Sequence, residues 1–485
     1  MTGIRRAFVL ASLGRYMMMV VNLAATLIMA RLLAPADYGV AVLGGSALAL
    51  AEAIRALGGG AYLVQRKDLT PEQIRTNFTI SLIATAVLVA AVLTLVRPLT
   101  EFFGRPELKP YLQVAVLGFV AGPITYQISA LMSRSLDFGR IALVTTACAV
   151  INAGTGIFLA LQGWGYMSLA WGTAVSALAA MVFYLHFWRD WSIFRPRLTE
   201  WRDVIRFGVH DSAFGMLSQI AEAAPYLIVG RVLDASSVGL LQRALLLALF
   251  PERVILAGVG AVALPAFSRL VREGNRPKAA YLNVLGLITA AQWPALVTLI
   301  LLAEPVVYVL LGSQWQGAVP LLRIFAGTLL FSFPMALHYP TLVAIGRIRI
   351  VPITLLAPTA AMIGILAFAA PLGSEAVALS AFAIVPFSGL LSLAVVRHFL
   401  KFSWLELVVV LARSAVITMA CALCSLAAVM ATGWHEKMSI PLAMVVGVLA
   451  IAGWIGGMWV VHHPLLQEIA QLWTKLRSRI VTLVR

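Results

Sequence analysis

Charged and amide side chains occur inside long apolar stretches of this sequence, where a membrane would surround them. These residues are Asn22, Glu52, Arg55, Glu222, Arg243, Glu252 and Arg253. A charged group near the centre of a bilayer costs several kcal/mol, so it normally faces a partner or a water-filled cavity. A guanidinium group stays charged at any depth and donates two parallel hydrogen bonds to a phosphate. The arginines therefore indicate binding of an anionic, phosphate-bearing ligand, and the acids and the amide indicate a cavity that takes up a proton or a cation.

The same charges allow a second interpretation, in which they only neutralise one another. Glu52 and Arg55 are three residues apart on one predicted helix, a spacing that allows an ion pair, and Glu252 is followed directly by Arg253. Arg55 and Arg243 lie towards the ends of their predicted helices, from which long side chains reach the membrane surface. A structural role and a binding role therefore both remain open at this point.

These residues belong to two copies of one sequence pattern. RLLAPADYGV at residues 31–40 returns as RVLDASSVGL at residues 231–240, which is 200 residues later. The same register pairs Asn22 with Glu222 and Glu52 with Glu252. Such internal repeats in a membrane protein are typical of a transporter whose halves rock about a central site. Because each copy has an even number of predicted spans, the two halves are parallel and the axis that relates them runs along the membrane normal.

Composition excludes a water-soluble protein. The chain of 485 residues is 61% hydrophobic and only 12% charged, whereas soluble domains have about 45–50% and about 25%. Apolar runs of about 20 residues, enough to cross a bilayer as helices, recur along its whole length. The sequence predicts an all-α integral membrane protein with about 14 transmembrane helices, at residues 13–32, 38–58, 78–97, 110–132, 141–162, 166–188, 207–231, 238–266, 281–303, 317–345, 349–370, 375–397, 405–431 and 439–461.

The net charge of +16 reflects membrane topology and does not indicate nucleic-acid binding. With fourteen spans and a cytoplasmic N-terminus, most of the 36 Lys and Arg residues fall on cytoplasmic segments. This is the inside-positive bias of multi-pass membrane proteins. The sequence thus predicts a protein of the bacterial inner membrane with both termini in the cytoplasm.

Motifs for soluble catalytic chemistry are missing from the sequence. It has no GxxxxGK[ST] phosphate loop and no HExxH metal motif. Its three cysteines, Cys148, Cys421 and Cys424, fall within predicted spans, where packing is their simplest role. We therefore expect neither an enzyme nor a bound cofactor or metal.

The repeat and the apolar runs divide the chain into five expected parts. The linker between the halves mixes Trp191 and Trp201 with charged residues, as segments at a membrane surface do. The tail places its apolar residues on one helical face. The expected parts are an N-terminal six-helix bundle at 1–189, a cytoplasmic interfacial linker at 190–206, a C-terminal six-helix bundle at 207–398, two additional transmembrane helices at 405–462 and an amphipathic cytoplasmic tail at 463–485.

Several strings resemble the Wzx-type polysaccharide flippases of the multidrug/oligosaccharidyl-lipid/polysaccharide exporter superfamily. Besides RLLAPADYGV, these strings are GLLQRA at 239–244, LPAFSRL at 264–270, LGSQWQGAVPLLRI at 311–324 and AIGR at 344–347. The likeness is greatest to the colanic-acid-exporter (WzxC-like) branch and covers most of the first twelve predicted spans.

The resemblance implies a V-shaped pair of six-helix bundles followed by two extra helices. It implies that an undecaprenyl-diphosphate-linked oligosaccharide is flipped across the membrane by alternating access, for exopolysaccharide, capsule or O-antigen biosynthesis. Arg55 and Arg243 fit the family's cavity arginines, and Arg253 is added because of its depth. The expected partners are membrane lipid, a coupling proton or sodium ion, and polymerase and chain-length proteins. A monomer is expected, because the cavity lies within one chain.

Three other functions fit the sequence less well. A peptidoglycan lipid-precursor flippase would be expected to carry more arginine on its first span, where this chain has only Arg15 near the inner end. A multidrug or cation antiporter of the same superfamily would share the repeat, but the two added spans and the arginines favour an anionic lipid-linked substrate. A membrane oligosaccharide polymerase or ligase would be expected to carry a large outer loop, and the predicted outer loops at 98–109 and 304–316 are short.

Overall fold

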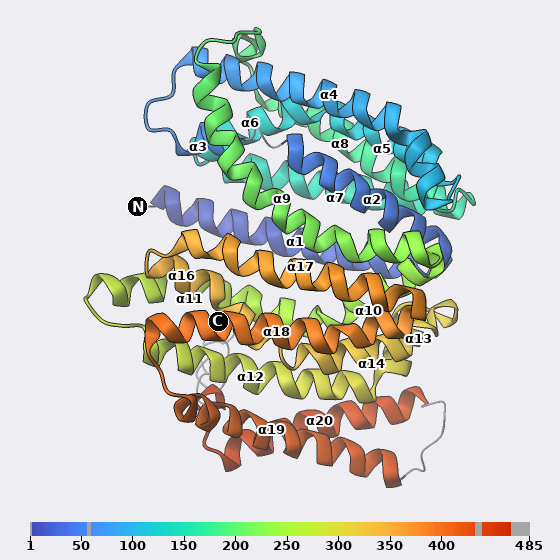
Figure 1. Ribbon diagram of the computed structural model, residues 1–485, viewed down its shortest axis with the longest axis vertical. Helices are drawn as coiled ribbons and strands as arrows, with labels where there is room; N and C mark the ends of the chain where they lie inside the picture. The colour runs from blue at the N-terminus through green and yellow to red at the C-terminus, as the bar shows by residue number, and fades with distance from the viewer. Residues whose placement is uncertain (1, 56–59, 432–438, 467–485) are drawn as a thin grey trace, which may run out of the picture. The chain divides into compact units, whose positions relative to one another are not determined.

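The chain folds into α-helices joined by short connections. A computed structural model describes the backbone of residues 2–55, 60–431 and 439–466 (Figure 1), and every regular element in these ranges is an α-helix or a 3-10 turn. The predicted all-α class is therefore confirmed. The expected tail at 463–485 lies outside the described residues from residue 467 onward.

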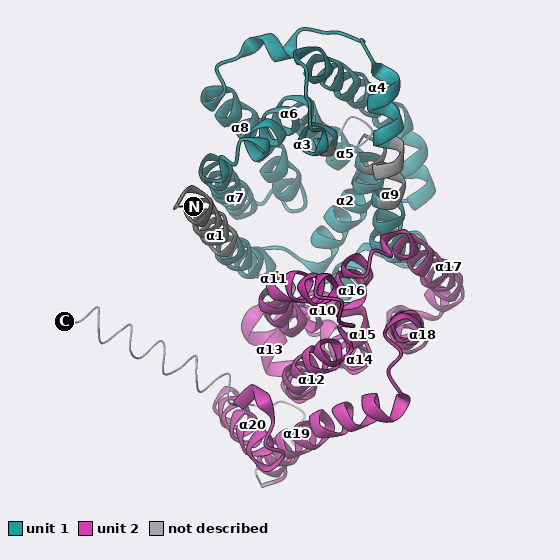
Figure 2. Cartoon of the chain, turned by 90° about the vertical axis from the view of Figure 1, so that its left-hand side faces the viewer, with its two compact units in different colours: residues 1–242 teal, residues 243–485 magenta. Residues whose placement is uncertain are grey.

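Packing divides the chain into two compact units, residues 1–242 and residues 243–485 (Figure 2). The first unit contains α1 (Thr2–Leu32), α2 (Pro35–Arg55), α3 (Ala61–Gln65), α4 (Pro71–Phe103), α5 (Leu108–Val120), α6 (Gly122–Arg134), α7 (Phe138–Leu161), α8 (Met167–Phe187), the 3-10 turn η2 (Trp191–Phe194), α9 (Trp201–Val232) and the start of α10 (Ala235–Ala248). The second contains the rest of α10 and then α11 (Phe250–Arg272), α12 (Lys278–Leu301), α13 (Ala303–Leu310), η3 (Ser313–Trp315), α14 (Ala318–Leu329), α15 (Phe333–Ala336), α16 (His338–Ala344), η4 (Ile348–Ile350), α17 (Val351–Ala369), η5 (Ala370–Leu372), α18 (Ser374–Leu400), α19 (Trp404–Ala431) and α20 (Ile440–Val460). The sequence predicts a division of the two repeat copies at the linker 190–206, whereas the packing units divide after residue 242. The first division follows sequence symmetry, which the packing of helices does not test, so it stays a prediction.

Eight helices among the described residues are long and apolar enough to cross a membrane, and ten spans result if each of two bent helix pairs is one span. The bent pairs are α5 with α6, at 42°, and α14 with the segment Phe333–Ala344, at 66°. The protein is therefore a multi-pass membrane protein, but the predicted count of fourteen spans is not confirmed. The helices α9 and α11 lie at predicted spans and are not among the eight, which are counted over the described residues alone.

Three predicted spans are interrupted in the structure. The span predicted at 110–132 bends between α5 and α6, where Pro123 lacks the amide hydrogen that an unbroken helix needs. The span predicted at 238–266 is divided into α10 and α11 next to Pro251, and the span predicted at 317–345 bends before Pro334. Proline is tolerated at such points in membranes because neighbouring helices satisfy the freed carbonyl groups.

Each unit has an apolar core of its own. In the first unit, Val92 of α4 and Leu112 of α5 belong to a buried cluster that α2 completes. In the second unit, Phe267 of α11 and Leu285 of α12 belong to a cluster that α18 completes. The last two helices, α19 and α20, pack closely on each other at Gly457, where a Cβ would come within 2.9 Å of the Cα of Ile417.

Candidate functional site

The predicted site residues are divided between the two units. The first unit holds Asn22 on α1, Glu52 on α2 and Glu222 on α9, and the second holds Arg243 on α10 and Glu252 and Arg253 on α11. The side chain of Arg55 lies outside the described residues. Among the others, Asn22, Glu222 and Arg253 are exposed, Glu52 and Glu252 are half-buried, and Arg243 is buried.

Glu52 lies beside a cavity within the first unit. The hydroxyl group of Tyr126 donates a hydrogen bond of 2.8 Å to its carboxylate Oε1. The cavity has a volume of about 330 Å³, which is room for several water molecules. Its polar lining residues are Glu52, Tyr111, Thr125, Tyr126 and Thr173, and Ala121 and Gly122 line it at the bend between α5 and α6. A carboxylate therefore faces a cavity at the point where a predicted span is broken.

Glu252 is held by a polar cluster within the second unit. Ser332 Oγ donates to Glu252 Oε2 at 2.9 Å, and Gln292 Nε2 donates to the same oxygen at 3.1 Å. Gln292 Nε2 also donates to Ser332 Oγ at 3.0 Å, so the three side chains form a closed triangle. Ser332 lies between α14 and α15, at the 66° bend, and Gln292 is 1% exposed on α12. The cluster thus joins α11, α12 and a second broken span.

The two arginines of the second unit have different surroundings. Arg243 is 1% exposed, and its guanidinium carbon lies 5.6 Å from the centre of the Trp315 ring, which is itself fully buried. A cation over an indole face is attracted by the ring quadrupole, most strongly when water is excluded. Arg253 is exposed on α11. In this conformation Arg253 is accessible to a ligand, whereas Arg243 packs on Trp315 in the protein interior.

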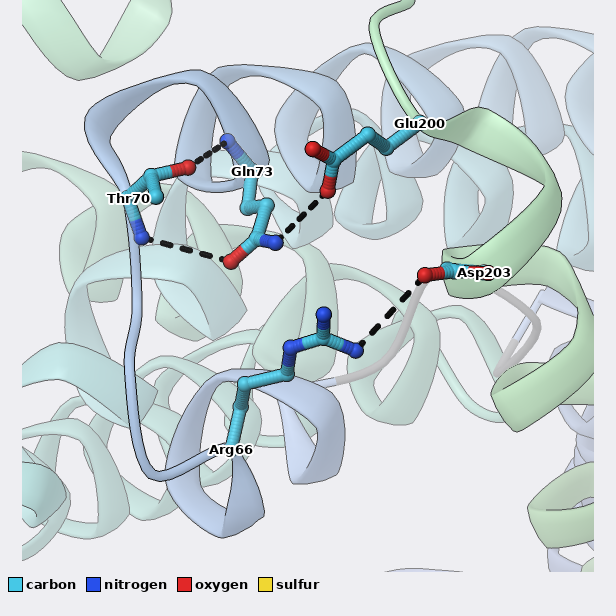
Figure 3. A network of polar contacts seen from close by, with 5 residues as sticks. All are labelled: Arg66, Thr70, Gln73, Glu200 and Asp203. Carbon is cyan, nitrogen blue, oxygen red and sulfur yellow. Dashed lines mark hydrogen bonds and ion pairs between the residues drawn. The ribbon is translucent and has the colours of Figure 1, made fainter.

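The linker is attached to the start of α4 by polar contacts that the sequence did not predict (Figure 3). Gln73, in the capping box of α4 with Thr70, donates from Nε2 to Glu200 Oε2 at 2.7 Å. Arg66, just after α3, lies 3.8 Å from the carboxylate of Asp203. The figure shows Gln73 and Arg66 pointing from one segment towards Glu200 and Asp203 on the other.

Buried contacts beside this network hold the linker backbone itself. Thr76, which is fully buried, donates from Oγ1 to the carbonyl oxygen of Thr199 at 2.7 Å, and the amide of Arg197 donates to Thr79 Oγ1 at 2.8 Å. The capping sequence TPEQ at residues 70–73 was readable as a helix start. Its attachment to residues more than 100 positions away carried no signal, because polar partners from distant segments leave no local spacing.

A linker carboxylate is also fixed by local hydrogen bonds. Asp190 Oδ1 accepts from the amide of Ser192 at 3.0 Å and begins η2. Hydrogen bonds from the side chain and backbone of Ser192 lower the pKa of Asp190 below its ordinary value. The linker is thus an ordered segment bound to the first unit and not an extended chain between two halves.

Comparison with known proteins gives one family. A family model described as polysaccharide biosynthesis protein matches residues 28–320. Similar curated proteins include the succinoglycan biosynthesis transport protein ExoT of Rhizobium meliloti, 27% identical over 66% of this chain and 65% of its own, and the lipopolysaccharide biosynthesis protein WzxC of Escherichia coli, 23% identical over 61% of each chain. The matched region thus spans somewhat less than two thirds of these relatives.

Solved structures share the fold. The lipid II flippase MurJ in an inward closed conformation superposes with a TM-score of 0.75 over 94% of this chain and all of its own, at 15% identity. An inward-facing multidrug resistance MATE family transporter of the MOP superfamily superposes with a TM-score of 0.62 over 79% of this chain and 94% of its own, at 16% identity. At such identities the likeness concerns the fold alone.

Proposed function

Because the chain belongs to the polysaccharide biosynthesis protein family, we propose that it flips an undecaprenyl-diphosphate-linked oligosaccharide repeat unit across the bacterial inner membrane. The observation that carries this proposal is the family match over residues 28–320 of a multi-pass helical chain, which includes both repeated strings, at 31–40 and 231–240. The product would serve exopolysaccharide, capsule or O-antigen assembly. Its role is transport, as the name of the ExoT relative states for that protein, and not catalysis.

In this proposal, the arginines bind the diphosphate group of the substrate. Arg253 is exposed on α11 and has the planar donor geometry that suits phosphate oxygens. Arg55 is the second proposed contact. Arg243 is the third, on the condition that Trp315 moves away, since its guanidinium group is covered in this conformation.

In the same proposal, the acids and the amide bind the coupling ion. These residues are Glu52, Glu222, Glu252 and Asn22. Asn22 and Glu222 are exposed and repeat-equivalent, so either can face a hydrated path. We further propose a monomer with both termini in the cytoplasm that passes its product to polymerase and chain-length partners. The basic cytoplasmic segments support this orientation.

Deletion of the gene, followed by extraction of lipid-linked oligosaccharides and assay of the leaflet that holds them, tests the function. We expect complete repeat units to accumulate on the cytoplasmic face, and the wild-type chain to restore export. Accumulation of the peptidoglycan precursor instead would identify the related flippase. Single units that reach the periplasm but fail to lengthen would mean a polymerase or ligase and would overturn the proposal.

Variants in the same assay test the site. Arg253→Ala is expected to abolish flipping while the protein still inserts, because a diphosphate loses its accessible cation. Arg269→Ala is the matched control, since Arg269 is on the same helix and pairs with Glu273 at the surface, 2.8 Å away. If the Arg253→Ala chain flips lipid as well as the wild type does, Arg253 does not bind the substrate and has a structural role.

A further inference from the structure

The repeat-equivalent acids Glu52 and Glu252 share one feature, a hydroxyl donor beside a bent pair of helices within the same unit. Glu52 accepts a hydrogen bond from Tyr126, just after the α5–α6 bend, and Glu252 accepts one from Ser332, at the bend that follows α14. The two bent spans are the fourth predicted span of each repeat copy. One hydroxyl group at a helix break thus faces one carboxylate in each unit.

We propose that Glu52 and Glu252 are paired proton-binding sites, one in each repeat copy, and that uptake of each proton is transmitted to the neighbouring broken span. This inference rests on the proposed transport function and specifies its coupling ion. Broken membrane helices are where transporters bind coupling ions, because carbonyl and hydroxyl groups freed at the break can respond to the ion.

The hydrogen bonds of Ser332 link proton binding to the bend. Its hydroxyl group has one hydrogen and two acceptors in reach, Glu252 Oε2 at 2.9 Å and the carbonyl oxygen of Leu329 at 2.9 Å. When Glu252 is ionised, the charge attracts that hydrogen. When Glu252 takes up a proton from water, its new O–H donates to Ser332 Oγ, and the serine hydroxyl then donates to Leu329. The protonation state thus decides whether the carbonyl oxygen of Leu329, which already accepts from the backbone amide of Ser332 at 3.1 Å, receives a second hydrogen bond at the end of α14.

Gln292 gives an independent indication that this site has room for one more donor. Its Oε1 is buried and has no hydrogen-bond partner among the described residues, although its Nε2 makes two hydrogen bonds. A buried acceptor without a donor costs about 1–3 kcal/mol. The cluster around Glu252 thus already contains one buried acceptor that a further hydrogen could satisfy.

The neighbouring groups favour a proton over a metal cation. Both groups in contact with Glu252 Oε2 present hydrogens to it, whereas a cation would need their lone pairs. The described residues contain no cluster of three or more His, Cys, Asp or Glu side chains that could hold a metal ion. The charged neighbour of Glu252 is Arg253, and His338 on the adjacent α16 is hydrogen-bonded to Thr354. Around Glu52 the titratable lining groups are Tyr111 and Tyr126.

In the first unit, the cavity supplies the path for the proton. The bend residues Ala121 and Gly122 line the same 330 Å³ space as Glu52, so water in it would reach both the carboxylate and the break. Glu52 is therefore expected to exchange protons with solvent more readily than Glu252, whose contacts are the buried side chains of Gln292 and Ser332.

The test is infrared difference spectroscopy of the purified full chain between acidic and neutral buffer, in the absence of any lipid-linked substrate. We expect a protonated-carboxyl band that shifts in heavy water, and that is reduced in Glu52→Gln and again in Glu252→Gln. Glu273→Gln, an exposed acid paired with Arg269, is the control and should keep the band. Ser332→Ala should make the Glu252 contribution appear at higher pH, because the carboxylate loses a charge-assisted donor, and Ser332→Thr should not.

Two outcomes would overturn the proposal. One is a band that both glutamine variants retain in full. The other is a signal that depends on sodium at fixed pH when sodium is exchanged for choline, which would mean cation binding. Since no substrate is present, a chain that binds protons at these acids but fails to flip lipid would contradict only the proposed function. If Glu252→Gln does not fold, the pH at which the band appears in Ser332→Ala shows whether Glu252 binds a proton. An unchanged pH would overturn the proposal for the second unit.

Discussion

Gly39 and Gly239, which are 200 residues apart and equivalent in the two repeat copies, face each other at one helix crossing of the first unit. A Cβ on Gly39 would overlap the carbonyl oxygen of Ala235, and a Cβ on Gly239 would overlap that of Pro35. Pro35 and Ala235 are themselves 200 residues apart, so the contact is reciprocal. The starts of α2 and α10 therefore cross as two equivalent segments do around a local two-fold axis.

Alanine at either glycine should disrupt this crossing. Gly39→Ala and Gly239→Ala are each expected to lower the free energy of unfolding by about 1–3 kcal/mol, because backbone must move to admit the methyl group. The measurement is the temperature at which the purified chain loses its monodisperse peak. Gly154→Ala is the control, since nothing lies within 4 Å of its added Cβ and alanine favours a helix. Equal temperatures for all three variants would show that the crossing is looser than described.

The all-α class and the family could be predicted from the sequence, and both are confirmed. Apolar runs and strings that return 200 residues later can be recognised in the sequence itself, without knowledge of which segments pack together. The bend at Pro123 was not predicted. The count of fourteen spans is not confirmed, since eight to ten spans can be counted among the described residues.

The site was predictable only in part. The equivalence of Glu52 and Glu252 follows from the register, but their partners Tyr126, Gln292 and Ser332 come from segments 40 to 80 residues away and have no common spacing. The roles of the seven candidate residues stay predictions. The contact of Arg243 with Trp315 shows why the position within a predicted span is a weak guide, since a buried arginine can pack on an aromatic ring.

The attachment of the linker predicts a change in proteolysis. Thr76→Val removes the buried hydroxyl that donates to the Thr199 carbonyl, and the lost hydrogen bond should cost about 0.5–1.5 kcal/mol locally. Trypsin should then cut faster after Arg197, which is followed by Leu198, as measured by the appearance of two fragments over time. Glu72→Gln should change little, because its pair with Arg197 is half exposed and such pairs contribute at most about 1 kcal/mol. An unchanged cleavage rate in Thr76→Val would mean that the linker is held elsewhere.

Asp234 should contribute pH-dependent stability at the start of α10. Its Oδ1 accepts from the amide of Ser237 at 2.6 Å. Burial raises its pKa, but the hydrogen bonds from Ser237 and the nearby Arg105 outweigh this and lower the pKa of Asp234 below its ordinary value. A lowered pKa in the folded state gives stability that is present above the unfolded value and is lost as the pH falls through the folded value.

Two substitutions separate the charge of Asp234 from its capping role. Asp234→Ala should lose about 1 kcal/mol at neutral pH, and Asp234→Asn, which keeps a capping oxygen, should lose less. Unfolding temperatures measured in neutral and acidic buffer should show the difference between wild type and Asp234→Asn shrinking in acid. A difference that stays constant with pH would contradict a role for the ionised carboxylate.

Substitutions at the contact between Arg243 and Trp315 test whether Arg243 has a structural role or only binds substrate. Trp315→Phe keeps an aromatic face and should cost less stability than Trp315→Leu, which removes both the cation-π attraction, about 2 kcal/mol when desolvated, and ring volume. Arg243→Lys replaces the planar guanidinium group over the ring with a compact ammonium group. This variant should also be less stable than the wild type. In a double-mutant cycle the two losses should be less than additive, since each removes the same contact. An Arg243→Lys chain that is fully stable but cannot flip lipid would instead mean that Arg243 serves the substrate alone.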